Sequence, residues 1–199
     1  MKASFIASLF AFAAATAVAQ YTTQSAPFYL IVLSQNATLN GTALDACHEG
    51  AAIEGLCRGG SIAPSTASTT LFQFNTSSSS NTTVDQAGYL SWELRGGNFN
   101  LSEPMGLAFN PVSNVAVPLF TPGNEDSTLV SFDKNDLMNI GGYLDDRVVP
   151  PTQMTQQYYR WYICTTYYGY TYETLAWVLG QYPPENPSCQ KVHVKRVFA

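Results

Sequence analysis

The sequence predicts an all-β protein with a single compact domain of about 10–12 short strands. Runs rich in Val, Ile, Phe, Tyr and Trp recur along the chain, and Gly, Pro and Asn separate them. The 14 glycines and 11 prolines among 199 residues indicate frequent turns. With 12% charged and 13% aromatic residues, the chain does not have the composition of a disordered protein.

Ten of the strands can be placed from these runs. In chain order they are expected near Phe28–Leu33, Leu71–Phe74, Tyr89–Leu94, Leu107–Phe109, Val115–Leu119, Leu129–Phe132, Tyr143–Asp145, Tyr158–Thr165, Leu175–Leu179 and Val192–Val197. The interval Ala43–Ala52 is the place where one or two helical turns are expected.

A faint internal repeat favours a β-trefoil over a β-sandwich. The triplet Gly88-Tyr89-Leu90 recurs 54 residues later as Gly142-Tyr143-Leu144, and each triplet follows a short apolar strand. Arg160–Cys164 followed by Thr174–Trp177 could form a third unit. Because tripeptides also recur by chance in a chain rich in Gly and Tyr, the β-sandwich stays open as the alternative.

Residues 1–19 have the pattern of a secretory signal peptide. Lys2 is followed by the apolar run Phe5–Ala15, and Ala17-Val18-Ala19 provides a small-x-small cleavage site. The apolar run is too short for a membrane anchor, which needs about 20 residues. We therefore expect residues 20–199 to form a single secreted domain, located outside the cell or in the cell wall and not in a membrane.

The four cysteines all lie in the expected secreted domain, where disulfides are favoured. Three pairings are possible, and Cys47–Cys57 with Cys164–Cys189 is preferred because each bond closes a local loop. The C-x-x-C spacing typical of zinc sites is absent, so no metal site is expected.

Five sequons indicate a glycosylated surface. They match N-x-[ST] at Asn36, Asn40, Asn75, Asn81 and Asn100. We expect these stretches to be exposed and a binding face to lie elsewhere.

Several classes of function are disfavoured. A net charge of −5 without a basic run argues against nucleic-acid binding. The chain has no G-x-S-x-G, H-E-x-x-H, P-loop or G-x-G-x-x-G motif, so no catalytic residue and no cofactor is expected. His48, beside Cys47, is interpreted as a polar neighbour of a disulfide and not as a general base.

A glycoside hydrolase would need only two carboxyl groups, and this enzyme class stays open as an alternative. The sequence does not rank its candidates, which are Glu49, Glu54, Glu93, Glu103, Asp133, Asp136, Asp145, Asp146 and Glu173.

The densest chemical signal is aromatic. Tyr167, Tyr168, Tyr170 and Tyr172 lie close together inside the expected Cys164–Cys189 loop, as in an exposed hairpin braced by a disulfide. Tyrosine combines a flat apolar ring with a polar hydroxyl, which suits contact with sugars or with a protein partner. The alternative is that alternate rings face the core.

Three segments resemble small secreted proteins of filamentous fungi that carry a domain of unknown function. These segments are Phe28–Leu33, Asp45–Cys57 and the stretch from Leu175-Ala176-Trp177-Val178 to Asn186-Pro187-Ser188-Cys189. The end of the chain, with Trp161, Asn186-Pro187 and Cys189, is more loosely similar to PhiA-type fungal cell-wall proteins. Neither resemblance implies an activity, so neither assigns a functional residue.

The sequence thus predicts a non-catalytic extracellular or wall-associated protein, whose partner is a cell-wall polysaccharide or another extracellular protein. The alternatives are a hydrolase that uses two carboxyl groups and an effector-type protein that binds a host protein.

Overall fold

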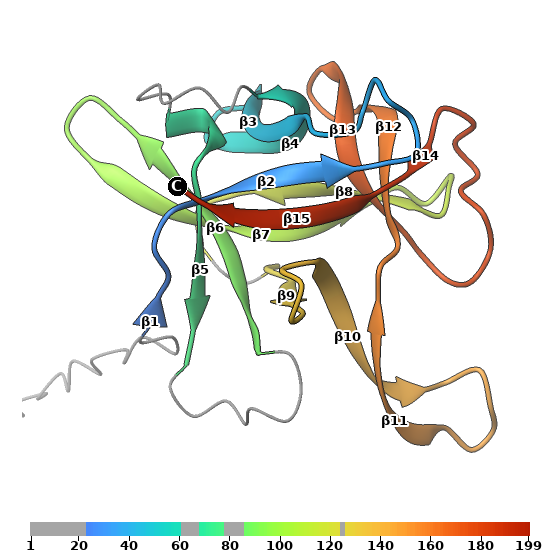
Figure 1. Ribbon diagram of the computed structural model, residues 1–199. Coiled ribbons are helices and arrows are strands. Elements are labelled where there is room, and N and C mark those ends of the chain that lie inside the picture. The colour runs from blue at the N-terminus through green and yellow to red at the C-terminus, as the bar shows by residue number, and fades with distance from the viewer. Residues whose placement is uncertain (1–22, 61–67, 78–85, 124–125) are drawn as a thin grey trace, which may run out of the picture.

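An eight-stranded antiparallel barrel forms the body of the protein (Figure 1). The computed structural model describes residues 23–60, 68–77, 86–123 and 126–199, so the expected signal peptide lies outside the described residues. In the order in which neighbours pair, the barrel strands are β2 (Phe28–Leu33), β3 (Ala43–Gly50), β4 (Ile53–Gly60), β13 (Thr171–Val178), β8 (Val115–Phe120), β7 (Asn100–Phe109), β6 (Ala87–Arg95) and β5 (Phe72–Thr76). Pairing of β5 with β2 closes the ring.

Further strands extend the sheet beyond the barrel. They are β1 (Thr23–Gln24), β9 (Leu129–Phe132), β10 (Met138–Asp145), β11 (Thr152–Tyr158), β12 (Trp161–Tyr167), β14 (Gln190–Lys191) and β15 (His193–Phe198), with one 3-10 turn, η1 (Ser68–Thr70). Strand β12 pairs with β13, and β15 pairs with β2. Within the described residues no helix is long and apolar enough to cross a membrane.

The all-β class is confirmed, whereas the topology of the barrel establishes neither the trefoil nor the sandwich. The two Gly-Tyr-Leu triplets occupy different environments. Leu90 is fully buried in barrel strand β6, while the corresponding Leu144 is 47% exposed in β10. The repeat in sequence therefore does not correspond to two equivalent positions in the fold.

The helical turns expected at Ala43–Ala52 are wrong, because this segment forms strand β3 and the turn into β4. Strand β3 pairs with β4 from Ala43↔Gly60 to Gly50↔Ile53. Alanine and glutamate tolerate a helix locally, but cross-strand pairing along the whole segment overrides that weak preference. Strands β4 and β11 lie in regions where no strand was expected.

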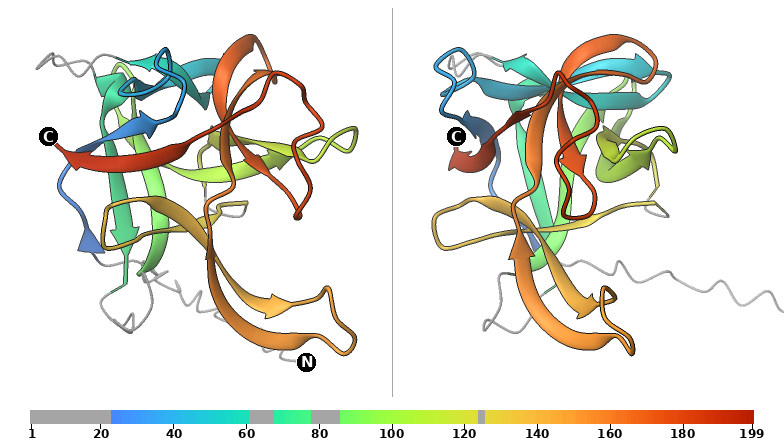
Figure 2. Two further views of the ribbon diagram at one scale, coloured as in Figure 1. Left: turned by 45° about the vertical axis from the view of Figure 1, so that its right-hand side comes forward. Right: turned by 90° about the vertical axis from the view of Figure 1, so that its right-hand side faces the viewer.

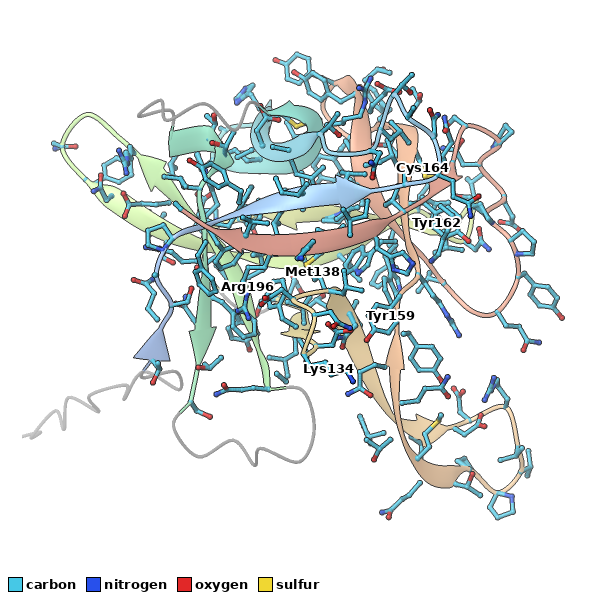
Figure 3. The ribbon with its side chains drawn as sticks, in the orientation of Figure 1. Lys134, Met138, Tyr159, Tyr162, Cys164 and Arg196 are labelled. Carbon is cyan, nitrogen blue, oxygen red and sulfur yellow. A yellow bond between two sulfur atoms is a disulfide. The ribbon has the colours of Figure 1, made fainter. Side chains whose placement is uncertain are left out.

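The main apolar core fills the barrel and includes residues of β12. Phe28, Phe72 and Phe120 are fully buried, as is Trp161 on β12. The Trp161 and Trp177 rings meet edge to face with their centroids 4.7 Å apart, and the Trp161 indole N–H donates to the Met138 carbonyl at 2.9 Å. Met138 is labelled in Figure 3. This packing attaches β12 to the barrel and fixes the base of the β12–β13 hairpin.

Two hairpins lie at opposite ends of the molecule. The β12–β13 hairpin turns beside β3 and β4 at the top of Figure 1, and the β10–β11 hairpin projects below the barrel in every view (Figures 1 and 2). We call the second hairpin, Met138–Tyr158, the arm. Strand β11, the second strand of the arm, is followed almost directly by β12, so one continuous stretch of chain joins the two ends of the molecule.

Candidate binding site

The four tyrosines singled out in the sequence lie at the turn of the β12–β13 hairpin. Strands β12 and β13 pair up to Tyr167↔Thr171, which leaves residues 168–170 as the turn. Tyr167 is 72% exposed, Tyr168 45% and Tyr170 50%, while Tyr172 is half-buried. At these positions the rings therefore do not fill the core. We call Tyr167, Tyr168, Tyr170 and Tyr172 the tyrosine tip.

A buried carboxylate holds the turn in place. Glu49, near the end of β3, is 3% exposed, and its Oε2 accepts hydrogen bonds from the backbone N–H groups of Gly169 at 3.0 Å and Tyr170 at 2.9 Å. The two bonds satisfy the N–H groups of two successive residues of the turn. Glu49 thus anchors the tyrosine tip to the barrel.

Glycine is needed at position 169. A Cβ at Gly169 would lie 1.8 Å from the backbone oxygen of Glu49, far closer than atoms can approach. The turn is therefore packed directly on the backbone of β3.

His48 extends the aromatic surface of the tip. Its ring centroid lies 5.6 Å from that of Tyr170, and the Tyr170 and Tyr172 centroids are 6.1 Å apart. His48 itself is exposed. No local sequence pattern connects His48 or Glu49 with the tyrosines, because more than 100 residues separate them along the chain.

One disulfide lies on a strand that carries the tip, and a second crosslinks the strand pair beside it. Cys47–Cys57 crosslinks β3 and β4, and Cys164–Cys189 ties β12 to the segment that precedes β14. These are the two pairs that loop length favours in the sequence. Near the hairpin end, the buried Thr166 and Thr174 hydroxyls hydrogen-bond each other at 2.7 Å. A disulfide on β12, a hydrogen bond between β12 and β13, and a disulfide between the neighbouring strands β3 and β4 thus stabilise the surroundings of the tip.

The barrel also contains a buried pair of carboxyl groups. Glu54 shares the interior face of β4 with Leu56, and Glu103 shares that of β7 with Met105. Burial is the main cause that raises the pKa of Glu103 to about 8, and the neighbouring Glu54 carboxyl adds to the shift. Both carboxyl oxygens of Glu103, and Oε2 of Glu54, have no hydrogen-bond partner among the described residues.

Most of the other candidate carboxylates are engaged in structural contacts. Glu93, Asp136, Asp145 and Glu173 each form an ion pair with an arginine. Asp133 accepts hydrogen bonds from backbone N–H groups in its turn and from the Tyr159 hydroxyl at 2.9 Å. No group of three or more metal-ligating side chains was found in the described part of the chain.

The sequons lie in contrasting environments. Asn40 and Asn100 are exposed. The amide of Asn36 donates to Gln190 Oε1 at 2.6 Å, and that of Asn75, half-buried in β5, donates to the Ser91 hydroxyl at 3.1 Å. Asn81 lies outside the described residues.

A family model described as Domain of unknown function (DUF7907) matches residues 25–198, nearly all of the described chain. The chain belongs to this family. Its match runs from before β2 to the end of β15, so the barrel, the tip and the arm all fall within one family domain. No curated protein and no solved structure matches the chain. The family carries no assigned activity, so any function must be argued from the residues themselves.

Proposed function

We propose that this protein is a secreted, non-catalytic binding protein whose tyrosine tip contacts the sugar rings of a cell-wall polysaccharide. The observation that carries the proposal is the exposure of Tyr167, Tyr168 and Tyr170 on a turn that Glu49 holds in one conformation. Secretion is supported by the pattern of residues 1–19 and by the two disulfides, which persist in oxidising compartments.

The chemistry of the tip suits a carbohydrate. A sugar ring presents C–H groups on its faces and hydroxyls at its edge, and tyrosine offers an apolar ring face beside a phenolic hydroxyl. Rings that are already held in place lose little conformational entropy when a ligand binds. The anchored turn therefore favours binding more than equally exposed rings on a loose loop would.

A hydrolase that uses Glu54 and Glu103 is less well supported. Glycosidases place their two carboxyl groups about 5 Å or more apart, on either side of a substrate. Here Glu103 is fully buried and Glu54 is 7% exposed, so neither carboxyl group is open to a polymer outside the barrel. The pair is therefore better placed to contribute to barrel stability than to reach a polymer.

Retention of the protein, produced as residues 20–199, on insoluble chitin, β-glucan and mannan tests the proposal. We expect the wild type to be retained on at least one polymer, and Tyr170→Ala and Tyr172→Ala to reduce retention by about tenfold, the loss of roughly one aromatic contact. Tyr143→Ala is the matched control, because Tyr143 is 80% exposed but lies on the arm.

Wild-type protein that passes through all three polymers would overturn the proposal. Equal losses for Tyr143→Ala and Tyr170→Ala would contradict the role of the tip. If the protein instead captures a partner from host extract through the same tyrosines, the effector-type alternative replaces polysaccharide binding.

A further inference from the structure

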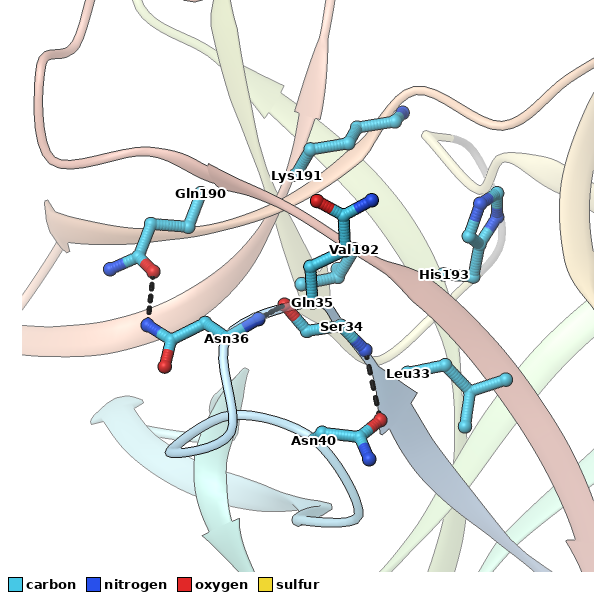
Figure 4. Close-up of a pocket in the computed structure, with 9 residues that line it drawn as sticks. All are labelled: Leu33, Ser34, Gln35, Asn36, Asn40, Gln190, Lys191, Val192 and His193. Carbon is cyan, nitrogen blue, oxygen red and sulfur yellow. Dashed lines mark hydrogen bonds between the residues drawn. The ribbon is translucent and has the colours of Figure 1, made fainter.

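A polar pocket lies beside the first strand of the barrel, where the turn after β2 meets β14 and the start of β15 (Figure 4). Its volume is about 590 Å³, within the range of small-molecule sites. The tyrosines of the tip are not among its lining residues.

Four carboxamides line this pocket: Gln35, Asn36, Asn40 and Gln190. Three of them form hydrogen bonds that stiffen its wall. Asn36 donates to Gln190 Oε1 at 2.6 Å, and Asn40 Oδ1 accepts the backbone N–H of Ser34 at 3.0 Å (Figure 4). Across the opening, the turn and β14 are thus tied together although 154 residues separate Asn36 from Gln190.

Other polar groups of the lining are left for a ligand. The amide of Gln35 has no hydrogen-bond partner among the described residues, and the same holds for the nitrogens Asn40 Nδ2 and Gln190 Nε2. An amide group offers both donors and an acceptor, and a sugar hydroxyl likewise donates and accepts. The half-buried Leu33 adds apolar surface, whereas Val192, also in the lining, is 1% exposed.

The charges at the pocket favour a neutral ligand. No Asp or Glu lines it. The Lys191 ammonium donates to the Tyr159 carbonyl and lies 4.7 Å from the centroid of the Tyr162 ring, and Figure 4 shows its side chain extending away from the amides. The positive charge of Lys191 therefore interacts with the Tyr159 carbonyl and the Tyr162 ring and not with the amides of the pocket.

From these contacts we infer that the pocket is a second binding site, separate from the tyrosine tip, and that it takes one or two units of a neutral saccharide. The carboxamides recognise the hydroxyls, and the apolar patch accommodates a C–H face of the sugar. No tyrosine of the tip lines this pocket, so saccharide binding here and polymer binding at the tip can be disproved independently.

Such a sugar can come from two sources. It can be a unit of an external saccharide, or it can belong to the N-glycan of the protein itself, because Asn36 and Asn40 are both sequons and both line the pocket. Asn40 Nδ2 is the better placed for attachment, since Asn36 Nδ2 is engaged by Gln190.

The first arm of the test uses unglycosylated protein, produced in a bacterial periplasm so that both disulfides form. Titration of the ¹⁵N-labelled protein with glucose, mannose and N-acetylglucosamine is followed by NMR. We expect at least one sugar to shift the side-chain amide signals of Gln35, Asn40 and Gln190. Gln35→Ala should weaken that binding about five- to tenfold, the effect of one neutral hydrogen bond.

Tyr170→Ala is the control and should leave these shifts unchanged, whereas it weakens retention on wall polymer. Absence of shifts with all three sugars, or shifts confined to the tyrosine tip, would overturn the inference while leaving the proposed function intact.

The second arm repeats the titration with protein from a eukaryotic secretory host. Loss of binding there, restored by enzymatic removal of the glycan, identifies the protein's own glycan as the occupant. Retained binding identifies an external saccharide.

Discussion

The β12–β13 hairpin, which carries the tyrosine tip, and the arm both have exposed aromatic residues, yet the contacts that support them differ. The tip is tied to β3 by Glu49. One disulfide ties its strand β12 to the segment before β14, and the other crosslinks the neighbouring strands β3 and β4. The arm pairs β10 with β11 alone beyond its base, and most of its residues are exposed, up to 97% at Val149. An isolated two-stranded hairpin is marginal in water. Exposure by itself therefore does not define a binding site, because a ligand binds more favourably to rings that already have a fixed position.

The largest expected effect concerns the barrel beneath the tip and its dependence on pH. Glu103 has a folded-state pKa of about 8, above its ordinary value of 4.5, so the folded protein binds more protons than the unfolded one between these values. Stability should therefore be greatest below about pH 4.5, fall as the pH rises and level off near about pH 8.

Urea unfolding followed by tryptophan fluorescence at several pH values across that window measures this dependence. Glu103→Gln should flatten it, because the amide stays neutral throughout. Leu101→Gln, on the same strand but exposed, serves as control and should leave the pH dependence as it is. A wild-type profile that rises with pH in this window would contradict the assignment.

Removing the anchor should make the tip resemble the arm. Glu49→Ala leaves the N–H groups of Gly169 and Tyr170 without their acceptor and is expected to cost about 2–3 kcal/mol of unfolding free energy, together with most of the polymer retention. Glu49→Gln keeps one acceptor oxygen and should lose about half as much. Urea titration and polymer retention measure the two effects. If Glu49→Ala binds as well as the wild type, anchoring is not what distinguishes the two hairpins.

A glycine in each hairpin provides a matched pair. Gly169→Ala places a methyl group against the Glu49 backbone, which must shift, and should cost about 1–3 kcal/mol. For Gly141→Ala on the arm, nothing lies within 4 Å of the new Cβ, and the change should stay within about 0.5 kcal/mol. Thermal or urea unfolding of the two variants decides the matter. Equal costs would show that the turn relaxes freely and is no more fixed than the arm.

The smallest effect is expected at the end of the arm. Hydrogen bonds from Arg147 hold the pKa of Asp145 at about 2, so this contact contributes stability above pH 3.8 that is lost as the pH falls through about 2. The pair is exposed to solvent, and Asp145→Asn should leave the urea midpoint at neutral pH almost unchanged. A clear drop in the midpoint would mean that the arm is coupled to the barrel more tightly than its contacts indicate.

Much of the strand pattern could be predicted from local sequence. Phe28–Leu33 and Leu129–Phe132 match β2 and β9 residue for residue, because their alternating or continuous apolar runs leave few other structures. The segment Ala43–Gly50 could not be predicted in this way. Its small and polar residues become a strand only because β4 lies beside them along their whole length.

By itself, the sequence determined that the chain is all-β, that loop length favours two particular cysteine pairs, and that four tyrosines lie close together between Cys164 and Cys189. Each of these follows from residue type and short-range spacing. The tertiary structure decided that the tyrosines face outward, that Glu49 holds their turn, and that Asn36 meets Gln190 across a pocket. Those contacts join residues 120 or more positions apart, and chain closure over such distances is set by the packing of the whole barrel, which no local pattern encodes.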